Sequence, residues 1–417
     1  MRKLTVKNFS VIKEAELEFG KITVLIGPQS SGKSLLCKLA YFLGYEVIRI
    51  AIDLVVNQLP FSQFEATVQK DFERWFPRSG WGDQNWSIAF ASDRYQLTVS
   101  APTTPVQNQK VDLSISEDFR LAYNKRLQET LEEQKRQGFL LKVGLWSLAA
   151  TEFTRLAGRG VWDASTYIPL ERSYFVDTQK GYRMLGAEAD PISAQFAVVY
   201  ADSMSREIPK PRIRKFLNGD LVYQPDEVSF EFADGRLLPL SYLSSGSKET
   251  LPILAVLDMY EHRRRQSRKS PTQELSGDQL SFFDDFSVEE PEASVFPSTQ
   301  YALVCELSQL ANEANFHPHF TITTHSPYIL TAFNDLIKAG YIAAERPDQA
   351  PEIEKIIPRQ YWIKPGEFAA YAFDGKDGIL RSIMDDETKM INGDILDDIS
   401  SNIADEFGQL LEIQYGG

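Results

Sequence analysis

The stretch Gly27–Ser34 has the sequence Gly-Pro-Gln-Ser-Ser-Gly-Lys-Ser, and its spacing, G-x-x-x-x-G-K-S, constrains the fold more than any other part of the chain. It follows the apolar run Lys21–Ile26, which predicts a buried strand. It precedes a segment, 33 to 56, in which apolar residues recur at helical spacing. A strand, a glycine-rich turn and a helix in this order form a phosphate-binding loop. We therefore expect an α/β domain built around a nucleotide site.

The residue types of this loop have separate tasks in phosphate binding. Glycines let backbone N–H groups turn inward around phosphate oxygens, and the amino end of the following helix adds positive potential. Lys33 is expected to reach the β- and γ-phosphate oxygens of ATP, and Ser34 is expected to ligate Mg²⁺. The predicted nucleotide contacts of the loop are Gly27, Pro28, Gln29, Ser30, Ser31, Gly32, Lys33, Ser34 and Leu35.

Two adjacent acids, Glu289 and Glu290, follow the short run Phe286–Val288. Acids at a strand end can divide the work: Glu289 would hold Mg²⁺ through its water shell, and Glu290 would orient or deprotonate an attacking water. Polar residues interrupt the run, so an alternative registration places the metal acid at Asp284 or Asp285. An acidic loop before a helix, with no catalytic role, is the structural alternative.

Two further segments complete the predicted site. His325 directly follows the predicted strand Phe320–Thr324, where its side chain can hydrogen-bond a γ-phosphate held at the neighbouring strand. The segment Leu243–Glu249 precedes a predicted helix, and small hydroxyl and glycine residues at a helix amino end form an anion site, although they also serve as ordinary N-caps. The nucleotide contacts that we assign to this segment are Ser244, Ser245 and Gly246.

The chain has 417 residues, of which 43% are apolar, an ordinary globular balance. The expected division is an N-terminal lobe with the phosphate loop and a β subdomain (1–115), a helical insertion (116–160) and a C-terminal lobe (161–417). The C-terminal lobe contains a polar stretch, 266–285, which we interpret as a flexible surface insertion. The helical segment Glu117–Leu156 is broken by glycines and is too short for a long coiled-coil arm.

Charge and cysteine content narrow the function classes. The formal charge of −14 opposes nonspecific nucleic-acid binding, because an acidic surface repels phosphate. Basic clusters at 210–215 and 263–269 are local exceptions, and such clusters are most often solvated faces. The two cysteines, Cys37 and Cys305, suggest no disulfide framework. No segment approaches the roughly 18 apolar residues of a membrane span, so we expect a cytoplasmic protein.

The order of these motifs resembles that of ABC-type ATPase heads. The phosphate loop is followed far downstream by a Leu-Ser-Ser-Gly-Ser signature, then by Glu-Glu-Pro-Glu and by Thr-His-Ser-Pro. More narrowly, Glu289–Pro297 and Thr323–Pro327 resemble the AAA-type group of bacterial ATPases that includes the overcoming-lysogenization-defect proteins. The segment Tyr167–Ser173 is also similar to one that these ATPases carry, and we assign Arg172 within it no mechanistic role.

The resemblance implies an α/β ABC-ATPase head: a mixed β-sheet around the phosphate loop, an antiparallel β subdomain and a short helical insertion. It also implies a Mg²⁺-dependent ATPase that works as a head-to-tail dimer or higher homo-oligomer. In such a dimer, Ser244, Ser245 and Gly246 of one protomer contact the γ-phosphate bound to the other. The sequence departs from the common signature in having serine where a second glycine often stands, and it has no readily identified glutamine loop.

Members of the group it resembles frequently serve in anti-phage defence, where the ATPase controls a nuclease. In overcoming-lysogenization-defect nucleases, the nuclease is a carboxy-terminal Toprim domain with a characteristic pattern of metal-binding acids. That pattern is not reproduced here by Asp374, Asp377, Asp385 and Asp386. We therefore expect the chain alone not to be a nuclease and its effector to be a separate protein, an HNH nuclease as in Septu systems or a Toprim-like protein as in PARIS systems.

Three other hypotheses stay open. The chain is alternatively a DNA-repair or recombination ATPase that binds DNA directly, or a nucleotide-dependent scaffold with very slow hydrolysis. The segment Gln279–Phe283 resembles the short peptide by which bacterial replication proteins dock on the sliding clamp. Its apolar residues are equally expected of a core strand leading to Glu289.

Overall fold

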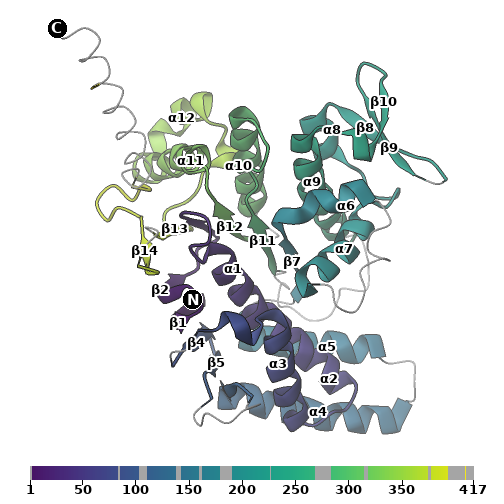
Figure 1. The fold of residues 1–417 in the computed structure, drawn as a ribbon. Helices are drawn as coiled ribbons and strands as arrows, with labels where there is room; N and C mark the ends of the chain where they lie inside the picture. Colours follow the sequence, from purple (N-terminus) through teal and green to yellow (C-terminus); the bar gives the residue numbers. More distant parts are fainter. Residues whose placement is uncertain are drawn as a thin grey trace.

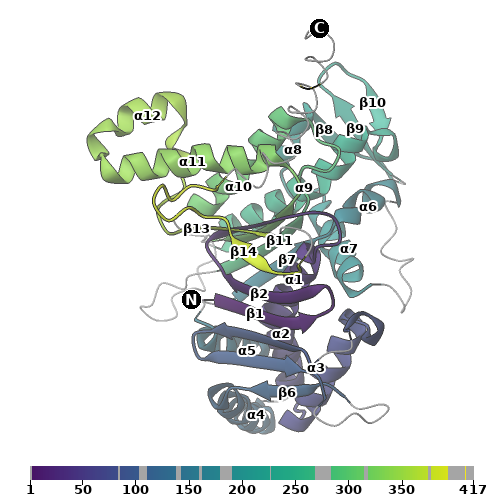
Figure 2. The same cartoon turned by 60° about the vertical axis from the view of Figure 1, so that its left-hand side comes forward.

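A computed structural model describes residues 2–82, 85–102, 110–137, 142–158, 162–178, 190–225, 227–267, 283–313, 318–373, 377–392 and 409. An antiparallel sheet and a larger, mostly parallel sheet lie next to each other, with helices around both (Figures 1 and 2). The predicted α/β class with a mixed sheet is confirmed. The division into three units at 115 and 160 stays a prediction.

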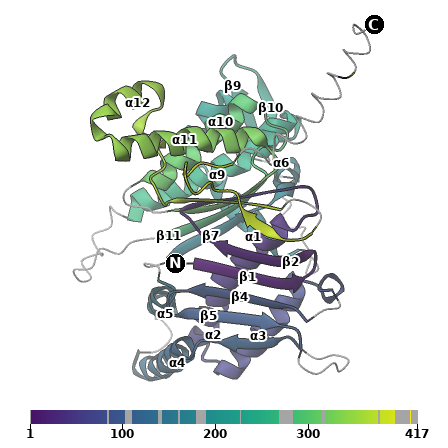
Figure 3. The ribbon, with the colours of Figure 1, turned by 90° about the vertical axis from the view of Figure 1, so that its left-hand side faces the viewer.

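The antiparallel sheet has five strands in the order β2-β1-β4-β5-β6 (Figure 3). Its strands are β1 (Arg2–Phe9), β2 (Ile12–Glu18), β4 (Ser87–Ser92), β5 (Tyr95–Ser100) and β6 (Asp112–Ile115). The turns that join β1 to β2 and β4 to β5 contain residues with positive φ, Asn8, Ser10 and Asp93. Asparagine and aspartate tolerate this region better than most side chains do, and the sequence predicts both turns, at Asn8–Ser10 and at Asp93–Arg94.

The parallel sheet has six strands in the order β14-β13-β3-β12-β11-β7, and only β14 is antiparallel to its neighbour. Its strands are β3 (Ile22–Ile26), β7 (Trp162–Ile168), β11 (Phe283–Glu289), β12 (His319–Thr324), β13 (Phe368–Phe373) and β14 (Leu380–Ser382). β11 forms in spite of its polar residues because β7 and β12 pair with it on both sides. Phe286 and Val288 are buried on it.

Helices α1 (Lys33–Tyr41) and α2 (Val47–Val56) are joined through a π-helical turn, η1 (Phe42–Glu46), so the helix predicted over 33–56 is confirmed. Near α2 lie α3 (Phe61–Trp75), α4 (Glu117–Gln137) and α5 (Lys142–Leu156), at the lower end in Figure 1. α3 was not predicted. Its buried residues Phe61, Phe64, Val68 and Phe72 nevertheless recur at helical spacing and form its core face.

To the right of β7 in Figure 1 lie a group of helices and a small sheet. The helices are α6 (Ser173–Thr178), α7 (Pro191–Ser203), α8 (Pro211–Leu217) and α9 (Ser245–Ser267). The small sheet, in the order β10-β9-β8, comprises β8 (Gly219–Tyr223), β9 (Val228–Phe232) and β10 (Leu237–Pro239). The sequence predicts one hairpin over Leu221–Leu240 with its turn at Asp234–Gly235. That turn joins β9 to β10, but a further break after Tyr223 separates β8 from β9.

In the described part of the chain, β11 is followed by the α-helices α10 (Pro297–Asn312), α11 (Pro327–Glu345) and α12 (Ala350–Ile356). α11 and α12 extend away from the sheets in Figure 2, and neither was predicted. The sequence predicts a terminal helix near Ile395–Leu411, and this segment lies outside the described residues, apart from residue 409. Most of the clamp-like segment, 279–282, also lies outside them. In the described part of the chain, every helix is too short or too polar to cross a bilayer.

Candidate nucleotide-binding and hydrolysis site

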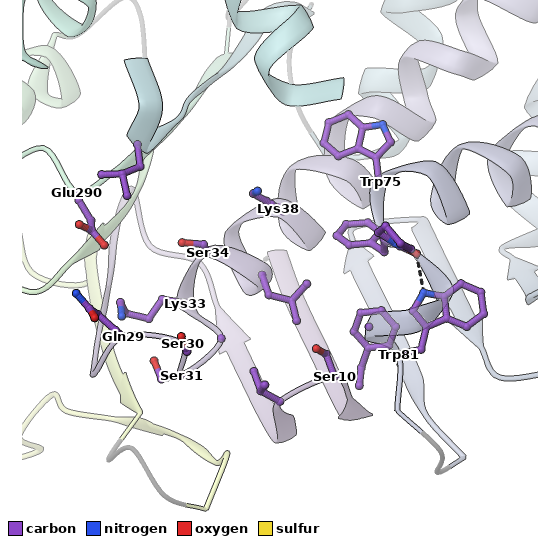
Figure 4. A pocket seen from close by; sticks show the side chains of 18 of the residues that line it. Ser10, Gln29, Ser30, Ser31, Lys33, Ser34, Lys38, Trp75, Trp81 and Glu290 are labelled. Atoms are coloured by element: carbon purple, nitrogen blue, oxygen red, sulfur yellow. Dashed lines mark hydrogen bonds between the residues drawn. The ribbon is translucent and has the colours of Figure 1, made fainter. Parts of the chain in front are cut away.

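Three neighbouring parallel strands end at one edge of the larger sheet. Ile26, the last residue of β3, is paired with Thr324, the last of β12, and Glu289 at the end of β11 is paired with Thr323. Because parallel strands point the same way, the residues that follow them meet at this edge. Lys33, Glu290 and His325, from the segments after these three strands, line one cavity of 680 Å³ (Figure 4).

The phosphate loop has a backbone that only glycine adopts easily at two positions. Gly27 has φ 152° and Gly32 has φ 108°. A Cβ at Gly27 would lie 2.8 Å from the carbonyl oxygen of Phe373 on β13, and one at Gly32 would lie 2.8 Å from Cγ1 of the buried Ile12. The loop therefore needs glycine both for its dihedral angles and for its close approach to β13 and β2.

We expect Gly32→Ala to lower the free energy of unfolding by about 1–3 kcal/mol more than Gly235→Ala does. Both glycines have positive φ, but a Cβ at Gly235 meets nothing within 4 Å, whereas one at Gly32 meets Ile12. The difference between the two losses in free energy of unfolding therefore measures the steric cost of the added Cβ at Gly32 separately from the cost of positive φ. Denaturant unfolding of the two variants measures it, and equal losses would contradict the close packing of the loop against β2.

Lys33 folds back over its own loop. Its Nζ donates hydrogen bonds to the carbonyl oxygens of Gly27 and Pro28, at 2.7 Å each. Burial lowers the pKa of Lys33, while the nearby carboxylates of Glu290, Glu292 and Glu289 act in the opposite direction. The ammonium group is thus held at the cavity by carbonyl acceptors that phosphate oxygens can replace.

Glu289 and Glu290 face different surroundings although they are adjacent. The carboxylate of Glu289 is buried; its Oε1 accepts from the hydroxyl of Tyr167 at 2.7 Å and its Oε2 from the N–H of Leu170 at 3.1 Å. Burial raises the pKa of Tyr167 well above its usual range, so this phenol stays a neutral donor. Glu290 instead lines the cavity, and its Oε1 lies 2.9 Å from Nε2 of His325.

His325 is positioned by an acid that the sequence analysis gave no role. Oε1 of Glu292 accepts from the backbone N–H of His325 at 2.6 Å and from the hydroxyl of Thr324 at 2.7 Å. The hydroxyl of Ser326 donates to the buried Gln300 at 2.6 Å. The strand end of β12 is therefore tied to the loop after β11, which brings the imidazole of His325 to Glu290.

The alternative metal acid lies at the wrong end of β11. Asp285 is paired in register with His319 at the start of β12, and it accepts from Nη1 of Arg2 at 2.7 Å. Four strand residues, 286–289, lie between it and Glu290, and each spans about 3.3 Å. Asp285 therefore faces the edge of the sheet opposite the phosphate loop, and Asp284 precedes it on the same strand.

The signature segment lies next to the loop after Glu290 but outside the cavity of its own chain. Ser244 precedes α9 and its hydroxyl accepts from the N–H of Ser247 at 3.3 Å, as an N-cap does. A Cβ at Gly246 would lie 2.7 Å from the carbonyl oxygen of Ser294. Among the described residues that line the cavity, Ser244, Ser245 and Gly246 are absent.

The oxygen donors at this edge suit Mg²⁺ in part. Ser34 offers a hydroxyl at the start of α1, and Glu289 and Glu290 offer carboxylates, which are the hard ligands that Mg²⁺ prefers. The part of the chain that the structure describes holds no group of three or more His, Cys, Asp or Glu side chains able to bind a metal ion. Mg²⁺ is commonly held by one or two protein oxygens together with substrate phosphates, and these residues fit that arrangement.

Comparison with known proteins agrees with an ATPase. Residues 174–330, which contain the signature segment, Glu289–Glu290 and His325, match the family described as AAA ATPase domain. No match was found among curated proteins. The phosphate loop lies upstream of the matched residues, so it is evidence for nucleotide binding that is independent of this match.

Solved structures show only a distant likeness. An SmcHead bound to the C-winged helix domain of ScpA is 13% identical, with a TM-score of 0.38, over 91% of this chain and 96% of that chain. The SMC head domain from Thermotoga maritima is 14% identical, with a TM-score of 0.32, over 79% and 90%. The recombination mediator protein RecF is 11% identical, with a TM-score of 0.34, over 91% and 97%.

Proposed function

We propose that this chain is an ATP hydrolase of the ABC type, which binds ATP between two copies of itself. One observation carries the proposal: the phosphate loop, Glu290 and His325 line the same cavity although they follow three different strands. A buried ammonium group and a carboxylate beside a phosphate-binding loop are groups that serve phosphoryl transfer to water, and the imidazole of His325 adds a hydrogen-bonding group. Phosphate release from ATP by the purified protein, measured with and without Mg²⁺, tests the proposal.

In this mechanism, the phosphates of ATP replace the loop carbonyls as partners of Lys33. Ser34 would hold Mg²⁺ directly and Glu289 would hold it through its water shell, and the ion would supply positive charge against the phosphate oxygens. Glu290 accepts a hydrogen bond from the attacking water and removes its proton, and His325 donates to the γ-phosphate. The contact between Glu290 and His325, at 2.9 Å, holds both side chains at the cavity before ATP arrives.

Three exposed aromatic residues on segments that adjoin the site in sequence support the dimer. Tyr242 and Phe296 are each 75% exposed and Tyr328 is 57% exposed. Tyr242 precedes the signature segment, Phe296 ends the loop after Glu290, and Tyr328 begins α11 just after His325. Aromatic residues exposed together are typical of protein–protein interfaces. A second copy that places its own α9 amino end over this cavity would cover them.

We expect Phe296→Ser to raise the dissociation constant of the ATP-bound dimer by about tenfold or more, as loss of a central aromatic anchor does. Ile356→Ser is the matched control, because Ile356 is 81% exposed but lies on α12, in the protruding part of the chain. Sedimentation velocity with ATP in a Glu290→Gln background gives both constants. Equal dimerisation of the two variants would place the interface elsewhere.

The proposed role in the cell is control of a separate effector nuclease in anti-phage defence, in the cytoplasm. This part rests on the resemblance of Glu289–Pro297 and Thr323–Pro327 to the defence-associated ATPases. Direct DNA binding is the second candidate. It is weakened because several basic residues of the two clusters have acidic partners: Arg214 pairs with Asp220, Lys215 with Glu306 and Arg263 with Asp202.

The identity of the adjacent open reading frame separates the two candidates. A nuclease gene supports the defence ATPase, and a recombination gene supports the DNA-binding ATPase. A direct assay adds to it: binding of the purified chain to duplex DNA in low salt, measured by fluorescence anisotropy, should be absent. Tight, salt-dependent binding would favour the recombination ATPase.

A further inference from the structure

Arg172 is a fully buried arginine at the edge of the sheet that carries the proposed site. It follows β7 in the short helix η4 (Leu170–Arg172), next to Leu170, which contacts Glu289. Its relative exposure is 0%, and it is the largest of the fully buried side chains in the described part of the chain. Burial of a guanidinium group costs much free energy unless its N–H donors are hydrogen-bonded. The hydrogen-bond partners of Arg172 therefore indicate which parts of the fold it stabilises.

The guanidinium group donates to the backbone at the end of β11. Nη1 donates to the carbonyl oxygen of Glu289 at 2.6 Å, and Nη2 donates to the carbonyl oxygen of Glu290 at 2.8 Å. Glu290 has φ 41°, a conformation that residues other than glycine adopt rarely. Its N–H donates to the carbonyl oxygen of Thr323 at 2.9 Å. Arg172 thus holds the carbonyl group of Glu290 and β12 holds its N–H group. Together these bonds stabilise the unfavourable backbone conformation of Glu290.

The same guanidinium group also contacts the first turns of α9. Nε donates to the carbonyl oxygen of Glu249 at 2.9 Å and lies 3.3 Å from Oε2 of its carboxylate. Glu249 lies four residues after Ser245, at which α9 begins. One rigid planar group therefore joins the peptide of the proposed catalytic acid to the helix that carries the signature segment.

The charge of Arg172 persists in this setting. Burial lowers its pKa, and the carboxylates of Glu249, Glu292, Glu289 and Glu290 act against that effect. Arginine keeps its proton in proteins because its ordinary pKa is so high. The hydrogen bonds are therefore charge-assisted, which makes them shorter and stronger than neutral ones.

We propose that Arg172 is a positioning residue that couples the placement of Glu290 to the position of the α9 amino end. The inference rests on the proposed ATPase function. When a second copy docks on α9, any movement of the α9 amino end is transmitted through the guanidinium group to the backbone of Glu290. The carboxylate of Glu290 is therefore aligned for water attack only in the assembled dimer. Lysine cannot replace arginine here, because its donors all lie on one nitrogen, whereas the three nitrogens of Arg172 reach four carbonyl groups, those of Pro169, Glu249, Glu289 and Glu290.

The test compares Arg172→Lys with Arg212→Lys. Arg212 is also buried and ion-paired, with Nη1 at 3.0 Å from Asp258 and at 2.6 Å from Glu261, but it joins α8 to α9 away from the cavity. Arg172→Lys should lower kcat roughly 10- to 100-fold through misplacement of Glu290, with affinity for an ATP analogue within about threefold of wild type. Arg212→Lys should leave both quantities near wild type.

Amide hydrogen exchange gives a readout that does not need hydrolysis. In Arg172→Lys, exchange should rise on the order of tenfold in two separate segments, 289–296 and 245–250, since charge-assisted hydrogen bonds to both are lost. Unchanged exchange there, or an equal loss of kcat in Arg212→Lys, would overturn the positioning role. Absence of ATP turnover in the wild-type protein would instead overturn the proposed function, and the exchange data would still decide on Arg172.

Discussion

Glu290→Gln should lower the rate of ATP hydrolysis about 10²- to 10⁴-fold, the usual effect of removing a general base. Glutamine keeps the size of the side chain and can still hydrogen-bond His325, which lies 2.9 Å from the present carboxylate. It cannot take a proton from water. ATP should therefore bind but persist, and the dimer should accumulate in the ATP-bound form. Steady-state phosphate release and gel filtration with labelled ATP measure the two effects.

Asp285→Asn is the control for this substitution. Asp285 lies on the same strand and is also acidic, but it bonds Arg2 at the opposite end of β11. Its variant should hydrolyse ATP at close to the wild-type rate, with a modest loss of stability from the broken ion pair. Normal turnover in Glu290→Gln together with a loss in Asp285→Asn would transfer the catalytic role to the other end of the strand.

Lys33→Ala should weaken nucleotide binding roughly 100-fold or more, because a buried charged partner of phosphate is removed. The ammonium group of Lys33 already lies at the cavity, bonded to the carbonyl oxygens of Gly27 and Pro28. Without it, the phosphates have only the backbone N–H groups and Mg²⁺ as partners. Titration with a fluorescent ATP analogue gives the dissociation constant directly.

Lys70→Ala on the exposed face of α3 is the matched lysine control and should bind ATP normally. A Lys33→Ala protein that binds ATP as tightly as wild type, with its thermal unfolding unchanged, would mean that the cavity between the loop and Glu290 is not the nucleotide site.

The parts of this molecule that were predictable are those fixed by neighbours in sequence. The phosphate loop, the turn at Asp93 and the helix after Lys33 follow from local residue chemistry, and the structure has all three. α3 was predictable too, because Phe61, Phe64, Val68 and Phe72 carry its pattern, and it was overlooked. β11 was less predictable, since its strand conformation depends on the pairing of β7 and β12 with it rather than on its own weakly apolar sequence.

Contacts between distant segments account for most of what the sequence could not reveal. Arg172 lies 117 positions from Glu289 and 77 from Glu249, so no local pattern indicates that one guanidinium group bonds both. The basic cluster around Arg212 was interpreted as a surface feature, but Arg212 is buried against Asp258 and Glu261 on α9. In both cases a charge is placed by partners that only the fold brings close.

The central claim, that ATP is held between the phosphate loop of one copy and the signature segment of another, is tested most directly by mixing two inactive variants. Lys33→Ala disables the loop, and Ser245→Arg places a bulky cation at the exposed start of α9. A mixed dimer contains one site with both elements intact if the signature acts on the partner's ATP.

Equimolar mixing should therefore restore ATP hydrolysis to as much as about a quarter of the wild-type rate, since half of the dimers are mixed and each has one intact site of two. The measurement is phosphate release from the mixture against each variant alone. Activity that stays at the level of the separate variants, with mixed dimers shown to form, would contradict the account, because it would mean that each chain completes its own site.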